Sequence, residues 1–150
     1  AREFLTQRSE FLLDDGSHLI RLAHDTEDCP GVLDALVGAA EETTSGLRPL
    51  RSFDLRIPVM ASNNARSKTL FDNAYGTGQS CWTTILDLID PRGVGAPVAR
   101  MSVVVIGYGD VGRGCARFGA ALGARVTVVE LDPVRALQAS MDGFAVASLQ

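Results

Sequence analysis

The sequence predicts an α/β fold with a doubly wound parallel sheet, and three observations in its C-terminal third support this class. Residues 101–106 form a short, β-branched apolar run followed at once by glycines, which is typical of a buried parallel strand. Residues 110–122 then favour a helix with small side chains on one side, and residues 125–130 favour a second strand. This β-α-β order predicts parallel strands with helices packed on the sheet.

The same alternation continues towards residue 150. Asp132 and Pro133 supply an N-cap and a first-turn proline for a helix that runs to about Met141. Gly143 ends this helix, and residues 144–149 are expected to form a third strand. The C-terminal part is therefore predicted to be the first half of a Rossmann-like doubly wound parallel sheet.

The first hundred residues are less regular. Residues 3–12 and 31–40 are expected to be helices, and residues 58–61 a short strand. Residues 80–89 favour a helix because apolar side chains recur at helical spacing. Residues 93–97 are expected to be a linker. The apolar face of the later helix comprises Trp82, Ile85, Leu86 and Ile89.

Composition excludes several classes of protein. Of the 150 residues, 46% are hydrophobic and 21% charged, which is typical of a globular chain. The net charge of −4 argues against nucleic acid or an anionic membrane as the main partner. No apolar run approaches the roughly 18 residues of a spanning helix. Three cysteines and two histidines without metal-ligand spacing predict no metal site, and free thiols indicate a reducing, cytoplasmic compartment.

A glycine motif provides the strongest functional signal. Residues 107–112 match G-x-G-x-x-G, and the motif lies between a predicted strand and a predicted helix, which is the context that dinucleotide binding requires. Gly107 allows the tight turn, Gly109 lets the backbone approach a pyrophosphate, and Gly112 lets helix and strand pack closely. The alternative is a glycine-rich turn that binds no ligand.

An acidic residue follows at the position that the motif requires. Glu130 ends the second predicted strand, 23 positions after Gly107, and would accept hydrogen bonds from the adenosine ribose hydroxyls. Its carboxylate repels a 2′-phosphate, so NAD is favoured over NADP. Arg135 lies close enough in sequence to affect that preference, although a solvated arginine is the simpler interpretation.

Three polar clusters precede the glycine motif. Asp14 and Asp15 follow an apolar segment, residues 41–46 join two glutamates to three hydroxyls, and residues 63–73 contain Lys68. Each cluster alone is consistent with a turn, a strand edge or a solvated loop.

Together, the clusters and the glycine motif resemble the adenosylhomocysteinase (S-adenosyl-L-homocysteine hydrolase) family in order and approximate spacing. The resemblance covers about residue 11 to residue 150. The matching motifs are Asp14-Asp15-Gly16, Glu41-Glu42-Thr43-Thr44-Ser45-Gly46, Ser67-Lys68, Phe71-Asp72-Asn73-Ala74-Tyr75-Gly76, the stretch from Gly107 to Ala116, Glu130-Leu131-Asp132-Pro133 and Ala136-Leu137-Gln138-Ala139.

The resemblance implies an enzyme that uses NAD to split S-adenosyl-L-homocysteine reversibly into adenosine and L-homocysteine, through transient oxidation of the 3′-hydroxyl. It also implies a cytoplasmic homotetramer of the methionine cycle. Residues 1–75 would be part of an α/β substrate domain, residues 76–97 a hinge helix and linker, and residues 98–150 the first half of the NAD-binding domain. Because the family's chain is much longer, we expect a segment of a longer polypeptide that does not turn over alone.

The resemblance also implies roles for individual residues. Lys68 and Asp72 would lie at the 3′-hydroxyl, Glu42 would bind the ribose hydroxyls, and Asp15 would join the acid–base chemistry near C4′ and C5′. The cofactor-binding residues implied by the glycine motif and the resemblance are Thr43, Thr44, Ser45, Asn63, Asn73, Gly107, Gly109, Asp110, Val111, Gly112, Glu130 and Arg135.

Two other functions remain open. Departures from the family pattern at His18, Thr77 and Arg135 are consistent with a non-catalytic relative that keeps the fold. A different NAD-dependent dehydrogenase, such as a 2-hydroxy-acid enzyme, is a further alternative. The clusters around Glu42 and Lys68 argue against it.

Overall fold

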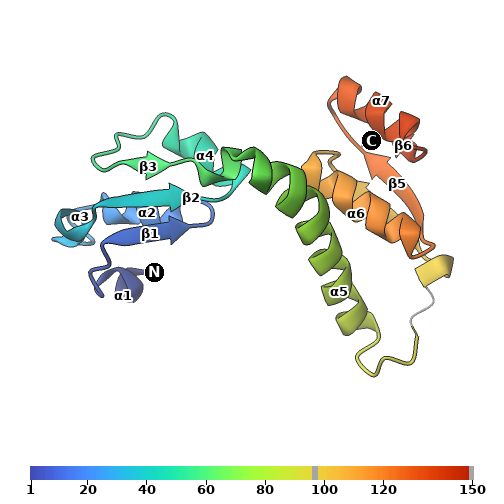
Figure 1. Ribbon diagram of the computed structural model, residues 1–150, viewed down its shortest axis with the longest axis horizontal. Helices are drawn as coiled ribbons and strands as arrows, with labels where there is room; N and C mark the ends of the chain where they lie inside the picture. Colours follow the sequence, from blue (N-terminus) through green and yellow to red (C-terminus); the bar gives the residue numbers. More distant parts are fainter. Residues whose placement is uncertain (96–97, 149–150) are drawn as a thin grey trace. The chain divides into compact units, whose positions relative to one another are not determined.

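The computed structural model describes residues 1–95 and 98–148 and divides the chain into two compact units, Ala1–Ala65 and Arg66–Gln150 (Figure 1). Each unit contains its own three-stranded parallel sheet, in the orders β1-β2-β3 and β4-β5-β6. The α/β class is therefore confirmed. The hinge predicted for residues 76–97 stays a prediction, and its Ala96 and Pro97 lie outside the described residues.

The first unit alternates short strands and helices. All three strands are parallel, and Asp14 of the first pairs in register with Glu41 of the second. The elements are α1 (Arg2–Leu5), β1 (Phe11–Asp14), α2 (His18–Ala23), α3 (Val32–Ala35), β2 (Gly38–Glu41), α4 (Thr44–Leu50), β3 (Val59–Met60) and the 3₁₀ turn η1 (Ser62–Asn64).

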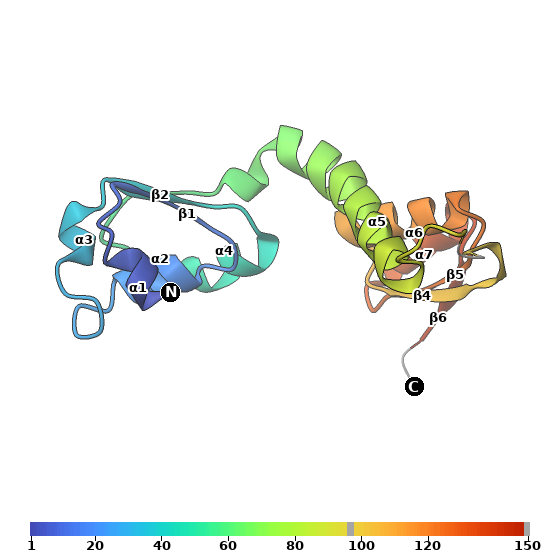
Figure 2. The same ribbon diagram turned by 90° about the horizontal axis from the view of Figure 1, so that it is seen from below.

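Helices cover one face of this sheet. Figure 2 shows α1, α2 and α4 on the same side of β1 and β2. Leu12 and Asp14 point to that side and are buried, whereas Phe11 and Leu13 are exposed on the other. The core includes Leu5, Leu12, Ile20, Ala23, Val32 and Leu50.

Two helix predictions for this unit are wrong in part. Residues 3–12 give only the single turn α1, and residues 11–14 form β1 instead. Residues 31–40 give the short α3, and residues 38–41 form β2. Short apolar runs fit a buried strand as well as a helix, so pairing between distant segments decides the outcome.

The second unit follows the predicted order of elements. The expected strands at 101–106 and 125–130 and the helices at 110–122 and 133–141 are confirmed within two residues. The elements are the π-helix η2 (Lys68–Gly76), α5 (Thr77–Ile89), η3 (Val98–Arg100), β4 (Ser102–Ile106), α6 (Asp110–Ala121), β5 (Arg125–Val129), α7 (Pro133–Met141) and β6 (Ala145–Ala147). Leu149 of the predicted third strand lies outside the described residues.

The core of the second unit lies between α5, α6 and the sheet. Trp82 of α5 is buried, and its indole Nε1 donates a 2.8 Å hydrogen bond to the carbonyl oxygen of Cys115 in α6. A Cβ on Gly119 would lie 2.5 Å from the Trp82 ring, so this glycine makes room for it. Asp132 caps α7 as predicted, accepting from the backbone N–H of Val134 at 2.8 Å.

The second sheet departs from expectation in its burial. The sequence predicts that β4 is buried, but only Val103 and Val105 pack against the core. Val104 and Ile106 are 61% and 73% exposed, because described helices cover only the opposite face (Figure 2). Ile89, on the apolar face of the helix predicted for residues 80–89, is also exposed.

Candidate functional site

In the first unit, polar residues follow the carboxyl end of each strand. Asp15 comes directly after β1, Glu42 directly after β2, and Asn63 shortly after β3. Because the three strands are parallel, their carboxyl ends lie at one edge of the sheet. Ligands of open α/β sheets bind outside this edge. Asp15 is exposed there, and the backbone N–H of Glu42 donates to the carbonyl oxygen of Asp14 at 3.0 Å.

The residues predicted to bind cofactor in this unit lie beside one another. Thr43 caps α4 by accepting from the backbone N–H of Gly46 at 3.0 Å. The buried Asn63 donates from its side-chain nitrogen to the Thr44 hydroxyl at 3.1 Å. Ser45 is exposed, and its hydroxyl donates to that of Thr43 at 3.4 Å.

Glu41 is the functional neighbour that sequence reasoning missed. It is fully buried, and its carboxylate accepts from the backbone N–H groups of Gly16 and Ser17 at 2.9 and 2.8 Å. The backbone N–H and hydroxyl of Thr43 donate to it at 2.9 and 2.6 Å. Burial raises the pKa of Glu41, but these four hydrogen bonds together outweigh burial and hold the pKa below its ordinary value. A strand prediction for residues 38–41 would have placed Glu41 on the same face as Ala39, which is buried.

In the second unit, η2 brings together two of the four predicted catalytic residues, Lys68 and Asp72. The Lys68 ammonium donates to the side-chain oxygen of Asn73 at 2.8 Å and lies 3.8 Å from the Asp72 carboxylate. In a π-helix, hydrogen bonds join residues five positions apart. Residues four and five positions after Lys68 therefore both lie near it. Gly76 leaves room for Asp72, because a Cβ there would lie 3.0 Å from its carboxylate oxygen.

The predicted glycine loop joins β4 to α6. Gly107 has φ +93°, a conformation that other residues rarely adopt, and no atom lies within 4 Å of the Cβ position. Gly112 is held against the loop, because a Cβ there would lie 2.0 Å from the carbonyl oxygen of Gly107. Asp110 and Val111 form the first turn of α6, where free N–H groups favour a phosphate. An open turn before a helix N-terminus fits a dinucleotide.

Glu130 lies at the carboxyl end of β5, where it holds the glycine loop. Its carboxylate accepts from the backbone N–H groups of Asp132 at 3.0 Å, Tyr108 at 2.6 Å and Leu131 at 2.7 Å. These bonds, with a smaller contribution from the Arg135 guanidinium, lower the pKa of Glu130. Glu130 is therefore an ionised acceptor beside the loop.

Arg135 faces the same loop from α7. A Cβ on Gly109 would lie 3.6 Å from the Arg135 guanidinium. The structure thus brings this positive group close to the second glycine of the motif and to Glu130. Tyr108 of the loop is anchored beyond α7, because its hydroxyl donates to the Asp142 carboxylate at 2.7 Å.

The segment η2, which carries the predicted catalytic residues Lys68 and Asp72, is in direct contact with α6. A Cβ on Gly114 of α6 would lie 2.4 Å from the carbonyl oxygen of Ala74 in η2. Gly78 makes a similar approach, since a Cβ there would lie 2.7 Å from the backbone of Gly114. The absence of side chains at these positions lets α6 lie directly against the segment that carries Lys68 and Asp72.

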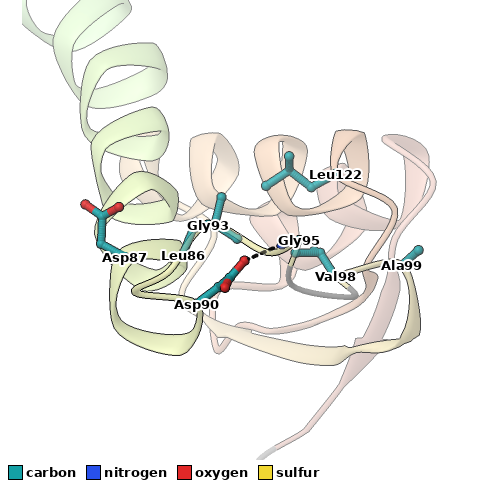
Figure 3. A pocket seen from close by; sticks show the side chains of 8 residues that line it. All are labelled: Leu86, Asp87, Asp90, Gly93, Gly95, Val98, Ala99 and Leu122. Carbon is teal, nitrogen blue, oxygen red and sulfur yellow. Dashed lines mark hydrogen bonds between the residues drawn. The ribbon is translucent and has the colours of Figure 1, made fainter.

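A pocket of about 520 Å³ lies at the other end of α6 from the glycine loop (Figure 3). Asp90 accepts from the backbone N–H groups of Val94 and Gly95 at 3.0 and 2.6 Å and so holds its loop. With Asp87, it makes the lining acidic, which disfavours a phosphate group. We do not assign this pocket to the dinucleotide.

Neither a membrane span nor a metal site is found among residues 1–95 and 98–148. No helix in these described ranges is long and apolar enough to cross a membrane. No group of three or more histidine, cysteine, aspartate or glutamate side chains in the same ranges could hold a metal ion.

The family model and the relatives found by sequence agree on one family. Residues 73–150 match the family described as S-adenosyl-L-homocysteine hydrolase, NAD binding domain. The adenosylhomocysteinase of Thermotoga maritima is 46% identical over 150 residues, covering 97% of this chain and 35% of that protein. The S-inosyl-L-homocysteine hydrolase of Methanothermobacter thermautotrophicus is 47% identical over 146 residues, covering 95% of this chain and 33% of that protein. The chain spans about a third of the length of these relatives.

A solved structure supports the fold independently. The dipicolinate synthase of Bacillus halodurans matches with a TM-score of 0.58 at 17% identity, over 78% of this chain and 39% of that chain. At this identity the likeness shows the α/β fold alone.

Proposed function

The chain belongs to the S-adenosyl-L-homocysteine hydrolase family, and we propose that it is the segment of a longer enzyme that binds NAD and carries out the acid–base chemistry of hydrolysis. The proposed reaction is the reversible conversion of S-adenosyl-L-homocysteine into adenosine and L-homocysteine. The observation that carries the proposal is the packing of η2, with Lys68 and Asp72, against the helix of the glycine motif.

The first half of the proposed reaction belongs to η2. Bound NAD supplies the hydride acceptor for transient oxidation of the ribose 3′-hydroxyl. Lys68 takes the hydroxyl proton as the general base of this step. Its side chain is 21% exposed, and Asp72 and Asn73 orient it from two sides.

The second half belongs to the first unit. Oxidation at C3′ acidifies the C4′ proton, and its removal lets homocysteine leave from C5′ by elimination. Water then adds to C5′ with return of a proton to C4′, and return of the hydride to C3′ restores the hydroxyl and gives adenosine. We propose that Asp15 transfers protons in these steps and that Glu42 binds the ribose hydroxyls. Both residues follow strand ends where ligands of parallel sheets bind.

The cofactor contacts are proposed on the same basis. The glycine loop and the start of α6 hold the pyrophosphate, and Glu130 accepts from the adenosine ribose. Arg135 contacts the ribose side of the loop, where its guanidinium lies near Gly109. The remaining proposed contacts are Thr43, Thr44, Ser45 and Asn63 in the first unit and Asn73 in η2.

A second substrate is supported by the comparisons. Relatives named adenosylhomocysteinase and S-inosyl-L-homocysteine hydrolase match at nearly equal identity. The two substrates differ in the purine base, and none of the contacts described above is to that base. S-inosyl-L-homocysteine is therefore the second candidate.

Both candidates are tested on the full-length protein. The protein, loaded with NAD, is incubated with each thioether, and the nucleoside is measured by chromatography while the thiol is titrated. We expect equal amounts of nucleoside and homocysteine from one substrate. If neither thioether yields a nucleoside and homocysteine, the proposed function is contradicted.

Assembly and compartment are further proposals. By family resemblance the enzyme is a homotetramer of the cytoplasm that acts in the methionine cycle. Native mass spectrometry of the full-length protein checks the tetramer, and the mass of a monomer would contradict it.

A further inference from the structure

Two buried carboxylates lie below the turn that carries Asp15. Asp14 and Glu41 are register partners on β1 and β2, and they are 4% and 0% exposed. Both carboxylates accept hydrogen bonds from backbone N–H groups, and Glu41 also accepts from the Thr43 hydroxyl. They therefore interact with the turn through hydrogen bonds.

The two carboxylates together hold the turn from Asp15 to Ser17. Asp14 accepts from the backbone N–H of Asp15 at 3.0 Å and of Ile20 at 2.8 Å. Glu41 accepts from the next two N–H groups, those of Gly16 and Ser17, one on each carboxylate oxygen. The two carboxylates thus hold the consecutive backbone N–H groups of Asp15, Gly16 and Ser17.

The turn needs this support because its backbone is strained. Gly16 has φ +98°, and Ser17, which has a Cβ, has φ +60°. A residue other than glycine persists in the left-handed region only when its surroundings hold it there. The hydrogen bond from the Ser17 N–H to Glu41 is such a constraint.

Glu41 also holds the start of α4. One carboxylate oxygen accepts from both the N–H and the hydroxyl of Thr43, and that hydroxyl in turn caps α4. Gly46 is required there, because a Cβ would lie 2.2 Å from the same oxygen. A single side chain thus connects the Asp15 turn to the segment that carries Thr43.

A buried carboxylate is an expensive way to stabilise a fold. Its removal from water is compensated only where hydrogen bonds satisfy the charge, and apolar residues often stabilise equally well. What the carboxylate provides in addition is geometry, since its two oxygens accept from donors on two separate segments.

We propose that Glu41 is a positioning residue, which fixes the turn that carries the Asp15 carboxyl and acts on the elimination through Asp15. The inference rests on the proposed function, in which Asp15 serves the elimination at C4′ and C5′. Glu41 itself lies below the strand ends and is closed off by the turn, α4 and the sheet.

The test compares Glu41→Gln with Glu10→Gln in the full-length protein loaded with NAD. Glutamine keeps the shape but replaces one acceptor oxygen with a donor, so part of the four-bond network is lost. Glu10 is exposed just before β1 and serves as the matched control. Two rates are measured: reduction of the bound cofactor by adenosine, at 340 nm, and release of homocysteine thiol.

A positioning role predicts a split between the two rates. Thiol release falls about 10- to 100-fold in Glu41→Gln, because a misplacement near 1 Å is enough for such a loss. Cofactor reduction, which depends on Lys68, stays within about twofold of wild type. Equal losses in both rates, or no loss in either, would overturn the inference.

A double-mutant cycle separates positioning from general destabilisation. If Glu41 acts through Asp15, then Glu41→Gln added to Asp15→Asn slows thiol release no further. Multiplicative losses would contradict the inference. Should Glu41→Gln fail to fold, Glu41→Asp keeps the charge but shortens the reach, and the same split is expected. A wild-type protein inactive in both assays would contradict the proposed function instead.

Discussion

Lys68 lies between Asp72 and Asn73 because the backbone around it is a π-helix. Family resemblance identified all three residues from the sequence. Their arrangement could not be predicted, since π-helical spacing has no sequence signature comparable to that of an α-helix. Lys68 is also the single lysine of the 150 residues.

A change of Lys68 to arginine tests its role as a base. Arginine keeps the positive charge near Asp72 but holds its proton at any working pH. We expect Lys68→Arg to lose adenosine-dependent cofactor reduction by about 100-fold or more, as for loss of general-base catalysis. NAD affinity, measured by calorimetry, stays unchanged.

The matched control is Arg66→Ala, at an exposed position two residues earlier. It is expected to leave both measurements at wild-type values. Cofactor reduction that survives in Lys68→Arg would show that another group takes the 3′-hydroxyl proton.

Glu41 predicts a particular acid sensitivity. Its pKa in the folded protein lies below the ordinary value of 4.5, so the ionised form stabilises the fold. This stability is fully present above pH 4.5 and is lost as pH falls through the lower pKa of the folded state. The free energy of unfolding should therefore fall less steeply below pH 4.5 in Glu41→Gln than in wild type.

Urea titrations of the two full-length proteins above and below pH 4.5 check this. Glu10→Gln again serves as the control and should follow wild type. Identical pH slopes in wild type and Glu41→Gln would contradict the assigned hydrogen-bond network.

At the scale of elements, α6 connects the two parts of the second unit's site. Its N-terminus follows the glycine loop, and its side without large residues contacts η2 and α5. Small residues on this helix were recognised in the sequence as a packing face. The spacing of these small residues does not show which element packs against them. The contact with η2 therefore could not be predicted from the sequence.

Gly114→Ala tests this contact. The added Cβ would lie 2.4 Å from the backbone carbonyl oxygen of Ala74, which cannot move without shifting η2. We expect a loss of about 1–3 kcal/mol in the free energy of unfolding. Slower cofactor reduction should accompany it, because the segment that carries Lys68 is displaced.

Ala121→Gly, an exposed position at the end of the same helix, is the control for helix propensity and should cost about 1 kcal/mol or less. Cofactor reduction in this control should match wild type. A Gly114→Ala protein as stable and as active as wild type would show that α6 and η2 do not pack as described.

The elements were predicted well where local signals agree and poorly where they conflict. The second unit combines β-branched strands, glycine stops and an Asp-Pro cap, and its strands and α-helices were expected. In the first unit, residues 11–14 and 38–41 are four-residue strands that pair over a long sequence distance. Their composition, with three small residues in the second, offers no strand preference, so pairing alone defines them.

At the scale of the molecule, the chain carries two sheets that are each covered on one face by described helices. Phe11 and Leu13 in the first unit, and Val104 and Ile106 in the second, are exposed. Parallel sheets are ordinarily covered on both faces. Since the chain spans about a third of its relatives' length, we expect the 150-residue chain alone to bind apolar dyes and to give no turnover.

The central claim is that this chain serves a hydrolase that reduces and reoxidises its own NAD. The most direct measurement adds adenosine to the full-length, NAD-loaded protein and follows absorbance at 340 nm before and after ultrafiltration. The account predicts that absorbance rises and stays with the protein. No rise would indicate a non-catalytic relative, and reduced cofactor in the filtrate would indicate an ordinary dehydrogenase; either result would contradict the account.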